Sequence, residues 1–282
     1  MPTTPLVQSR SGVQVPALLY GTAWKKEQTA ALVSQAIRAG FRGIDTACQP
    51  KHYHEAGVGD GVAACLSDGL KRTDLYLQTK FTSLSGQDPQ RVPYDPRASL
   101  PEQVQQSFAA SLRHLQTTYL DSLVLHSPMQ TLAQTLQVWR AMESLVEQGI
   151  VRQLGISNCY ELSVLQRIDA AARIKPAVLQ NRFYADTGYD REIRAYCRER
   201  GVLYQSFWTL SANPQLLASE TLQSLAKHYA STPAQILFRY LTHEGVVPLT
   251  GTKSTAHLRD DLAIFGFELT ASERDAITRL LE

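Results

Sequence analysis

Residues 122–157 read SLVLHSPMQTLAQTLQVWRAMESLVEQGIVRQLGIS, and this stretch predicts a complete strand–helix–strand unit. Residues 122–126 and 151–157 are short apolar runs of the kind found in buried strands. Residues 131–148 have helical periodicity, and Gly149 follows them as a stop signal. Because the connections are short, we expect the two strands to lie parallel in one sheet.

The same unit recurs on both sides of this stretch. Further strands are predicted at residues 18–22, 41–45, 75–79, 178–181, 202–206 and 246–249. Helices are predicted at residues 29–39, 55–66, 99–115, 161–171, 190–200, 215–229, 233–242, 255–265 and 271–281. Eight strands in 282 residues favour a closed barrel, and no glycine-rich phosphate loop of an open dinucleotide-binding sheet follows the early strands. We therefore predict an α/β protein, a (β/α)8 TIM barrel, with residues 1–282 forming a single domain.

Composition narrows the class of partner. The hydrophobic content of 44% suits a large core, and a net charge of +2 is too small to favour nucleic acid or an anionic membrane. The first residues lack the apolar core of a signal peptide, and no stretch approaches the ~20 apolar residues that span a bilayer. The cysteines form no CxxC pair, and no His/Cys cluster has metal-ligand spacing. We expect a cytoplasmic protein with reduced thiols and no metal.

Four polar residues fall at or just past the carboxyl ends of predicted strands, where barrels place their reactive groups. Asp45 and His126 each end a strand, and Lys80 follows one. Tyr53 lies in the loop after Asp45. Taken singly, Asp45 could be a helix cap and His126 an ordinary buried histidine. Lys80 could be a surface lysine, and Tyr53 could be a tyrosine at the rim. Together they suit acid catalysis on a carbonyl group.

The chemistry of these four residues is consistent. A tyrosine has a pKa of ~10, and lowering it to ~7 requires about 4 kcal/mol. One ammonium at ~4 Å supplies about that much at an effective dielectric constant of ~20, so Lys80 could activate Tyr53. Asp45 would keep Lys80 charged, and a neutral His126 would position the carbonyl oxygen. Because none of these groups carries a hydride, a cofactor must supply it.

Five segments together resemble the aldo-keto reductase superfamily along essentially the whole chain. Residues 43–47 resemble G-x-D-T-A, residues 53–59 resemble Y-x-N-E-x-x-V-G with His54 in place of Asn, residues 78–81 resemble the T-K segment, residues 125–128 resemble L-H-x-P, and residues 155–159 resemble G-V-S-N-F. The resemblance implies an NADP(H)-dependent oxidoreductase barrel, usually monomeric, that reduces aldehydes or ketones. It places the catalytic tetrad on Asp45, Tyr53, Lys80 and His126.

The resemblance also implies contacts with the nicotinamide half of the cofactor. The residues concerned are Gly21, Thr22, Ser157, Asn158, Gln180 and Phe207, and Asp45, Trp208 and Leu210 are further implied cofactor contacts. Phe207 takes the place of the tyrosine that usually stacks on the nicotinamide, and Trp208-Thr209 replaces a Ser-Pro pair. The pyrophosphate contacts therefore differ from the common pattern.

The last cofactor segment, residues 247–254, departs further from the family's I-P-K-S. Leu249 stands where the lysine is expected, and Lys253 is its candidate replacement. The hydroxyl-rich loop 250–254 opens a predicted helix and could itself bind an anion, although it is also an ordinary helix start. The implied contacts are Thr250, Gly251, Thr252, Lys253 and Asp261, with His257 or Arg259 near the adenine ribose. We expect NADPH, with NADH possible.

For the substrate, the predicted wall consists of Trp24, Trp208, Tyr53, His126 and the loop 83–97, although Trp24 could equally be a packed aromatic. About one helix follows Phe267, so we expect an open pocket for aldehydes or ketones of some bulk. Three alternatives remain. They are a regulatory barrel resembling potassium-channel β subunits, a Schiff-base aldolase using Lys80, and C=C reduction, which is associated with Glu in place of the histidine. Cys48, three residues past Asp45, is a candidate for redox control.

Overall fold

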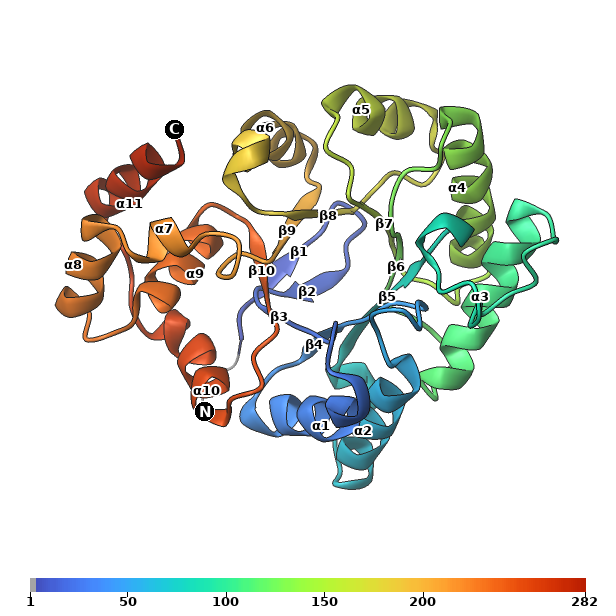
Figure 1. Ribbon diagram of the computed structural model, residues 1–282, viewed down its shortest axis with the longest axis horizontal. Helices are drawn as coiled ribbons and strands as arrows, with labels where there is room; N and C mark the ends of the chain where they lie inside the picture. The colour runs from blue at the N-terminus through green and yellow to red at the C-terminus, as the bar shows by residue number, and fades with distance from the viewer. Residues whose placement is uncertain (1–3) are drawn as a thin grey trace.

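Eight parallel strands close into a barrel, in the order β10-β3-β4-β5-β6-β7-β8-β9, in the computed structural model, which describes residues 4–282 (Figure 1). The strands are β3 (Leu19–Gly21), β4 (Gly43–Asp45), β5 (Tyr76–Phe81), β6 (Ser122–Leu125), β7 (Leu154–Ser157), β8 (Val178–Arg182), β9 (Leu203–Phe207) and β10 (Val247–Thr250). Because β3 pairs with both β4 and β10, the sheet closes on itself. The predicted (β/α)8 barrel is confirmed.

Helices surround the barrel on the outside (Figure 1). They are α1 (Thr29–Ala39), α2 (Glu55–Ser67), α3 (Leu100–His114), α4 (Leu132–Glu147), α5 (Leu162–Ala171), α6 (Arg191–Arg200), α7 (Pro214–Leu217), α8 (Glu220–His228), α9 (Pro233–His243), α10 (Thr255–Ala263) and α11 (Ala271–Thr278). Short 3-10 segments are η1 (Lys26–Gln28), η2 (Arg72–Asp74), η3 (Leu84–Gly86), η4 (Ala185–Asp190), η5 (Ile264–Gly266) and η6 (Arg279–Leu281).

Local sequence sets several helix ends. Ser99 and Glu102 form a capping box at the start of α3, and Thr232 and Gln235 form another at the start of α9. Both helices carry proline in the first turn, where its missing N–H costs nothing. Gly201 follows α6 with φ 67°, a left-handed conformation that glycine adopts without strain.

A hairpin that the sequence did not predict closes one end of the barrel. Strands β1 (Leu6–Gln8) and β2 (Gln14–Pro16) pair antiparallel, and in Figure 1 they lie across the centre of the ring. Val15 of this hairpin is fully buried, in one cluster with Leu19, Tyr76 and Val247. Those three are the first residues of β3, β5 and β10, so the hairpin covers the amino-terminal ends of the strands. Strands of three residues are too short to show a periodic pattern.

Four predicted elements have different boundaries in the structure, and the first difference has a clear local cause. The single helix predicted at residues 215–229 is two helices, because the Ser219 hydroxyl accepts a hydrogen bond from Leu222 N and begins α8 there. Strand β5 continues to Phe81, so Lys80 lies within the strand and not after it. The helices predicted at 255–265 and 271–281 end earlier and finish as 3-10 turns. The other predicted strands and helices have the predicted type, with ends shifted by up to three residues.

Two further observations concern the chain as a whole. Within residues 4–282, no helix combines the length and the apolar character needed to cross a membrane. All four cysteines are buried, and none of them forms a disulfide with another described residue.

Candidate active site

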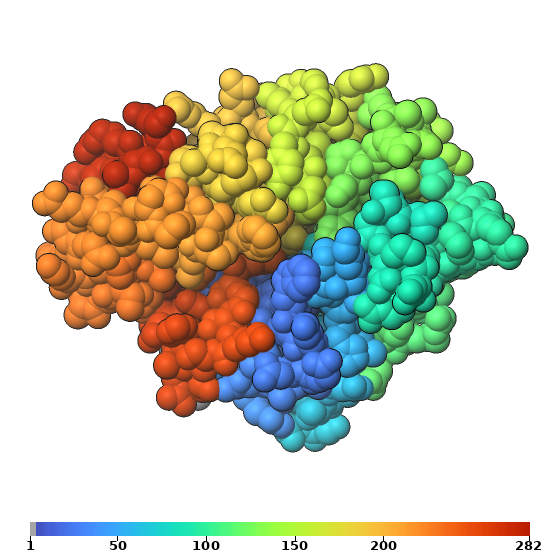
Figure 2. Space-filling model, viewed as in Figure 1, coloured from blue at the N-terminus to red at the C-terminus, as the bar shows by residue number. Residues whose placement is uncertain are grey.

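The carboxyl ends of the strands open into a cavity of about 790 Å³. Figure 2 shows this face of the molecule, which is hollowed near its centre. The cavity wall contains three of the four predicted catalytic residues, namely Asp45, Tyr53 and His126. The fourth, Lys80, lies directly behind Asp45 and is 1% exposed. The fold therefore brings the four residues to one place.

A buried ion pair forms the floor of this site. Lys80 Nζ donates to both carboxylate oxygens of Asp45, at 2.8 and 2.7 Å, and to Thr46 O at 2.8 Å. The side-chain amides of Gln78 and Gln180 donate to Asp45 Oδ1 at 2.7 and 3.0 Å. Burial lowers the pKa of Lys80, and the attraction of Asp45 opposes that shift. Every hydrogen on the ammonium thus has an acceptor, so the charge is held in one position.

Tyr53 and His126 lie above this ion pair. Lys80 Nζ is 5.4 Å from the centre of the Tyr53 ring, and the His126 ring lies edge-on to Tyr53 with the ring centres 6.1 Å apart. Burial raises the pKa of Tyr53 well above its usual range, and the charge of Asp45 raises it further. This direction is opposite to the predicted lowering by Lys80. The physical reason is that Asp45 offsets the field of Lys80 at the phenol, so desolvation dominates.

The predicted neutral state of His126 agrees with its surroundings. Burial lowers the pKa of His126 to about 3, and the positive charge of Lys80 lowers it in the same direction. His126 Nδ1 is 2.7 Å from the Thr82 hydroxyl. Among residues 4–282, Nε2 has no hydrogen-bond partner, so this nitrogen is the one available to a ligand in the cavity.

The predicted cofactor residues line two adjoining cavities. The first also contains Gly21, Thr22, Ser157, Asn158, Gln180, Phe207 and Lys253. A second cavity of about 520 Å³ contains Leu210, Thr252, His257 and Asp261. The two share Trp208, Leu249, Thr250 and Gly251, so they adjoin and form one groove. Arg259, the alternative to His257, borders neither cavity.

Hydrogen bonds fix several of these side chains in advance. Ser157 Oγ donates to Gln180 O at 2.6 Å, and Asn158 Nδ2 donates to His126 O at 2.8 Å. Thr250 Oγ1 donates to Asp261 Oδ2 at 2.7 Å. Burial raises the pKa of Asp261 to about 6. The groove therefore presents preorganised polar groups on a rigid set of strand ends.

Lys25 is a cavity residue that the sequence analysis missed. Its side chain is 1% exposed, and Nζ donates to Gly251 O at 2.7 Å. The ammonium also lies 4.8 Å from the centre of the Tyr20 ring. Burial, with a contribution from Lys253, lowers the pKa of Lys25 to about 8. Its position just after the first barrel strand was the signal available in the sequence.

The predicted substrate wall is formed only in part as expected. Trp24 and Trp208 line the cavity and are 52% and 49% exposed, so neither is simply packed beneath its mouth. The Trp24 ring lies 4.2 Å from the His52 ring. Of the loop 83–97, Ser83, Ser85 and Gly86 border the cavity. The buried Tyr94 hydroxyl ties the rest of that loop down by donating to Thr82 O at 2.9 Å.

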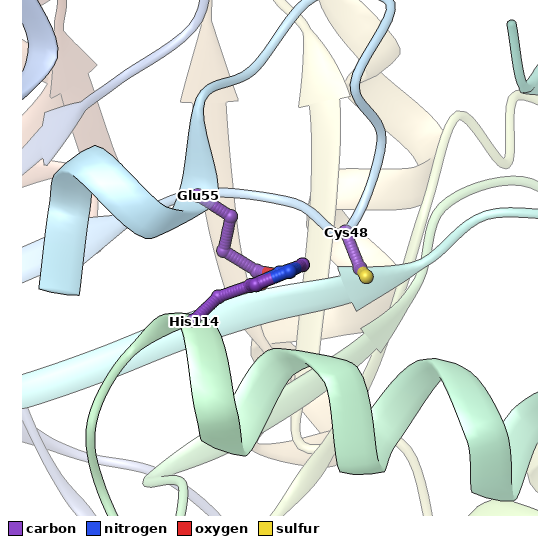
Figure 3. A group of neighbouring side chains, drawn as sticks. All are labelled: Cys48, Glu55 and His114. Atoms are coloured by element: carbon purple, nitrogen blue, oxygen red, sulfur yellow. The ribbon is translucent and has the colours of Figure 1, made fainter. Parts of the chain in front are cut away.

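A second polar cluster, drawn in Figure 3, includes a residue from each end of the segment that carries Tyr53. Potential metal-ligand atoms of Cys48, Glu55 and His114 lie within 4.8 Å of one another, which their sequence spacing did not suggest. The Glu55 carboxylate already accepts hydrogen bonds from Thr79 and Ser111 and contacts His114 Nδ1 at 2.8 Å.

These contacts indicate a structural role for the cluster. Burial raises the pKa of the Cys48 thiol well above its usual range, so the thiolate that binds metals or reacts with oxidants is disfavoured. Cys48 and Glu55 lie at the two ends of the Tyr53 segment, and Glu55 connects that segment to β5 and α3. The cluster therefore supports the position of Tyr53.

Comparison with known proteins agrees with this geometry. The chain is 28% identical over 275 residues to the uncharacterized oxidoreductase YtbE of Bacillus subtilis, covering 96% of this chain and 91% of that protein. It is 30% identical over 305 residues to a probable NAD(P)H-dependent D-xylose reductase of Aspergillus fumigatus, covering 99% and 95%. A solved aldo/keto reductase from Brucella melitensis has a TM-score of 0.84 and 28% identity, covering 99% and 100%. The model of the aldo/keto reductase family matches residues 17–282, and the chain therefore belongs to that family.

Proposed function

We propose that this protein reduces aldehydes or ketones to alcohols with NADPH. The observation that carries the proposal is the buried Asp45–Lys80 ion pair beneath Tyr53 and a neutral His126, at the inner end of an open cavity. A carbonyl oxygen placed between Tyr53 and His126 would meet two hydrogen-bond donors. Both would become stronger partners as negative charge develops on that oxygen.

Each residue has a definite role in this scheme. Tyr53 keeps its proton in the free protein, because burial raises its pKa, and it donates that proton to the carbonyl oxygen. The Lys80 ammonium, held by Asp45 and Thr46, stabilises the phenolate that remains. We assign the proton of the neutral His126 ring to Nε2, with Nδ1 accepting from the Thr82 hydroxyl, so that His126 orients the oxygen by donating from Nε2. Asp45 positions Lys80 and does not exchange a proton with the substrate.

The residues of the groove suit a nicotinamide dinucleotide, which supplies the hydride when bound. Lys25 and Lys253 both border the groove near Gly251, and within residues 4–282 neither forms a salt bridge with a carboxylate. The charge of Lys253 lowers the pKa of Lys25, so two ammoniums repel each other there and an anion would relieve the repulsion. Ser157, Asn158 and Gln180 would hold the carboxamide, with Phe207 against the ring.

The choice of NADPH over NADH rests on the far end of the groove. His257 and the hydroxyl-rich loop 250–254 lie there, beside Asp261, and the loop opens α10. The start of that helix favours negative charge, as a ribose phosphate would provide. The printed description of the Aspergillus relative, NAD(P)H-dependent, supports a nicotinamide cofactor without choosing between the two.

The site geometry bears on the three alternative functions named in the sequence analysis. A Schiff-base aldolase needs a free lysine amine, but every hydrogen of Lys80 Nζ is engaged and the side chain is buried. Carbonyl reduction is favoured over C=C reduction because His126 is present. A regulatory barrel would keep the groove but need not turn over carbonyls. We further propose that the protein is cytoplasmic, since four buried free thiols suit a reducing compartment. We also propose that it is a monomer. Size-exclusion chromatography would test the monomer.

The deciding experiment measures initial rates of NADPH and NADH oxidation with a panel of aldehydes and ketones, for the natural protein and Tyr53→Phe. We expect turnover with NADPH, and a loss of kcat in the variant on the order of 10²- to 10⁴-fold, because the proton donor is gone. The dissociation constant of NADPH should change by less than about twofold, since the phenol does not hold the dinucleotide. A near-normal kcat in Tyr53→Phe would remove Tyr53 from the mechanism. Tight NADPH binding without any carbonyl turnover would favour the regulatory alternative.

A further inference from the structure

Arg182 presents an unpaired positive charge to the cavity. It is the last residue of β8 and lines the cavity wall. Its Nε atom is buried without a hydrogen-bond partner, and within residues 4–282 its guanidinium forms no salt bridge. The centre of the guanidinium lies 4.2 Å from the Trp208 ring centre and 5.0 Å from that of Tyr184. Stacking on aromatic rings leaves the N–H edge of a guanidinium free to bind a planar anion.

The position of Arg182 relative to the reacting centre follows from the strand. Gln180, two residues earlier on β8, points into the barrel and donates to Asp45 Oδ1. Residues i and i+2 of a strand share a face, so Arg182 lies about 6.6 Å further towards the mouth on the same side. Its side chain therefore starts nearer the mouth than the carbonyl oxygen beside Tyr53 and His126, where it can reach another part of the same molecule.

Hydrogen bonds also connect this residue to the catalytic group. Arg182 N donates to the Tyr160 hydroxyl at 3.1 Å, and that hydroxyl donates to Asn158 Oδ1 at 3.2 Å. Asn158 in turn donates to His126 O at 2.8 Å. The spacing between Arg182 and His126 is thus set by a continuous chain of contacts, as a specificity site requires.

The other charges of the cavity do not satisfy Arg182. Asp45 is the acidic residue in the wall, and Lys80 already neutralises it. Lys25 and Lys253 add positive charge near Gly251, where the cofactor phosphates are proposed to lie. A cavity with this balance attracts anions and repels cations.

We infer that Arg182 binds a carboxylate of the substrate, so that the preferred substrates are aldehydes or ketones carrying a carboxylate several bonds away from the carbonyl group. The inference rests on the proposed function, because it assigns a substrate class to the same site. The carboxylate accepts two hydrogen bonds from the guanidinium edge, while Trp208 and Tyr184 shield the pair from water. Arg182 acts in binding and takes no part in proton transfer.

The test compares a charged and an uncharged substrate of the same shape. We would measure kcat/KM for para-carboxybenzaldehyde and para-methylbenzaldehyde with the natural protein, Arg182→Gln, Arg182→Lys and Arg140→Gln. Arg140 is an exposed residue of α4, so its variant controls for the loss of one positive charge. For each protein we would divide kcat/KM for the carboxylated aldehyde by kcat/KM for the methyl compound. Comparing this quotient between variants removes the intrinsic difference in reactivity between the two aldehydes.

We expect Arg182→Gln to lower kcat/KM for the carboxylated aldehyde on the order of 10- to 100-fold, mainly through KM, with less than about threefold change for the methyl compound. Arg182→Lys should recover part of the loss, because it keeps the charge but not the two-pronged geometry. Arg140→Gln should match the natural protein. Equal losses for both substrates would mean that Arg182 only supports Trp208, and would overturn the inference. A weaker affinity for NADPH in Arg182→Gln would assign the guanidinium to the cofactor and would overturn it as well.

A binding measurement keeps this inference separate from the catalytic proposal. Binding of para-carboxybenzyl alcohol to the NADPH complex, followed by tryptophan fluorescence, needs no turnover. Tighter binding of this compound than of para-methylbenzyl alcohol, lost in Arg182→Gln, would support the carboxylate site even if no carbonyl were reduced. Equal affinity for the two alcohols in the natural protein would overturn the carboxylate site even if aldehydes were reduced readily.

Discussion

We predict that the buried ammonium of Lys25 makes binding of the proposed dinucleotide cofactor sensitive to pH. Its pKa is lowered from 10.5 to about 8, first by burial and then by the charge of Lys253. The ammonium sits 2.7 Å from Gly251 O, at the junction of the two cavities that form the groove. If the pyrophosphate of the dinucleotide binds there, it favours the protonated lysine and raises its pKa in the complex.

The size of the effect follows from that pKa. At pH 7 about nine-tenths of Lys25 is protonated, and at pH 9 about one-tenth is, so the population competent to bind the diphosphate falls about ninefold to tenfold. The sign is fixed: affinity is highest below pH 8 and is lost as the pH rises through 8. The dissociation constants of NADPH and NADH should rise alike, because both carry the same pyrophosphate.

Titrations at several pH values, followed by quenching of Trp24 and Trp208 fluorescence, measure this dependence. Lys25→Met should bind both cofactors more weakly at pH 7 and should show a flat profile between pH 7 and 9. Lys227→Met, which removes an exposed lysine at the end of α8, serves as the control and should keep the tenfold slope. A flat profile in the natural protein, or an unchanged slope in Lys25→Met, would refute the reasoning.

Two further predictions concern the floor and the wall of the site. Asp45→Asn leaves the buried Lys80 ammonium without its partner and should lower the free energy of unfolding at pH 7 by about 3 kcal/mol. The loss should be smaller at higher pH, because Lys80 gives up its proton there. Urea denaturation at pH 7 and 9 measures both values, and a loss below about 1 kcal/mol at pH 7 would contradict the prediction. His126, whose pKa is about 3, should remain neutral throughout the working range, so its ring resonances in a nitrogen NMR spectrum should not move between pH 5 and 8; a titration with a midpoint near 6.5 would contradict the burial argument.

Local patterns, together with the resemblance to the aldo-keto reductases, located the four proposed catalytic residues. Asp45, Lys80 and His126 lie in or directly after strands. The positions of strands can be predicted from apolar runs and the turn residues that flank them. The β1–β2 hairpin escaped prediction because its stability comes from packing beneath the barrel. The break at Ser219 escaped because a serine cap inside a helical pattern competes with ordinary helix continuation.

Sequence alone determined the barrel, the order of its strands and the end at which chemistry could occur, because these depend on periodicity and on the rule that strand ends of parallel sheets converge. Tertiary structure decided the electrostatics. Lys25 meets Gly251 across 226 residues, and Arg182 lines the cavity with no acidic partner among residues 4–282. Tyr53 has a raised pKa, although its lysine neighbour was expected to lower it. Desolvation and charge act through space, so the pKa of a group depends on all the groups around it in the folded protein. The spacing of residues along the chain does not show which groups those are.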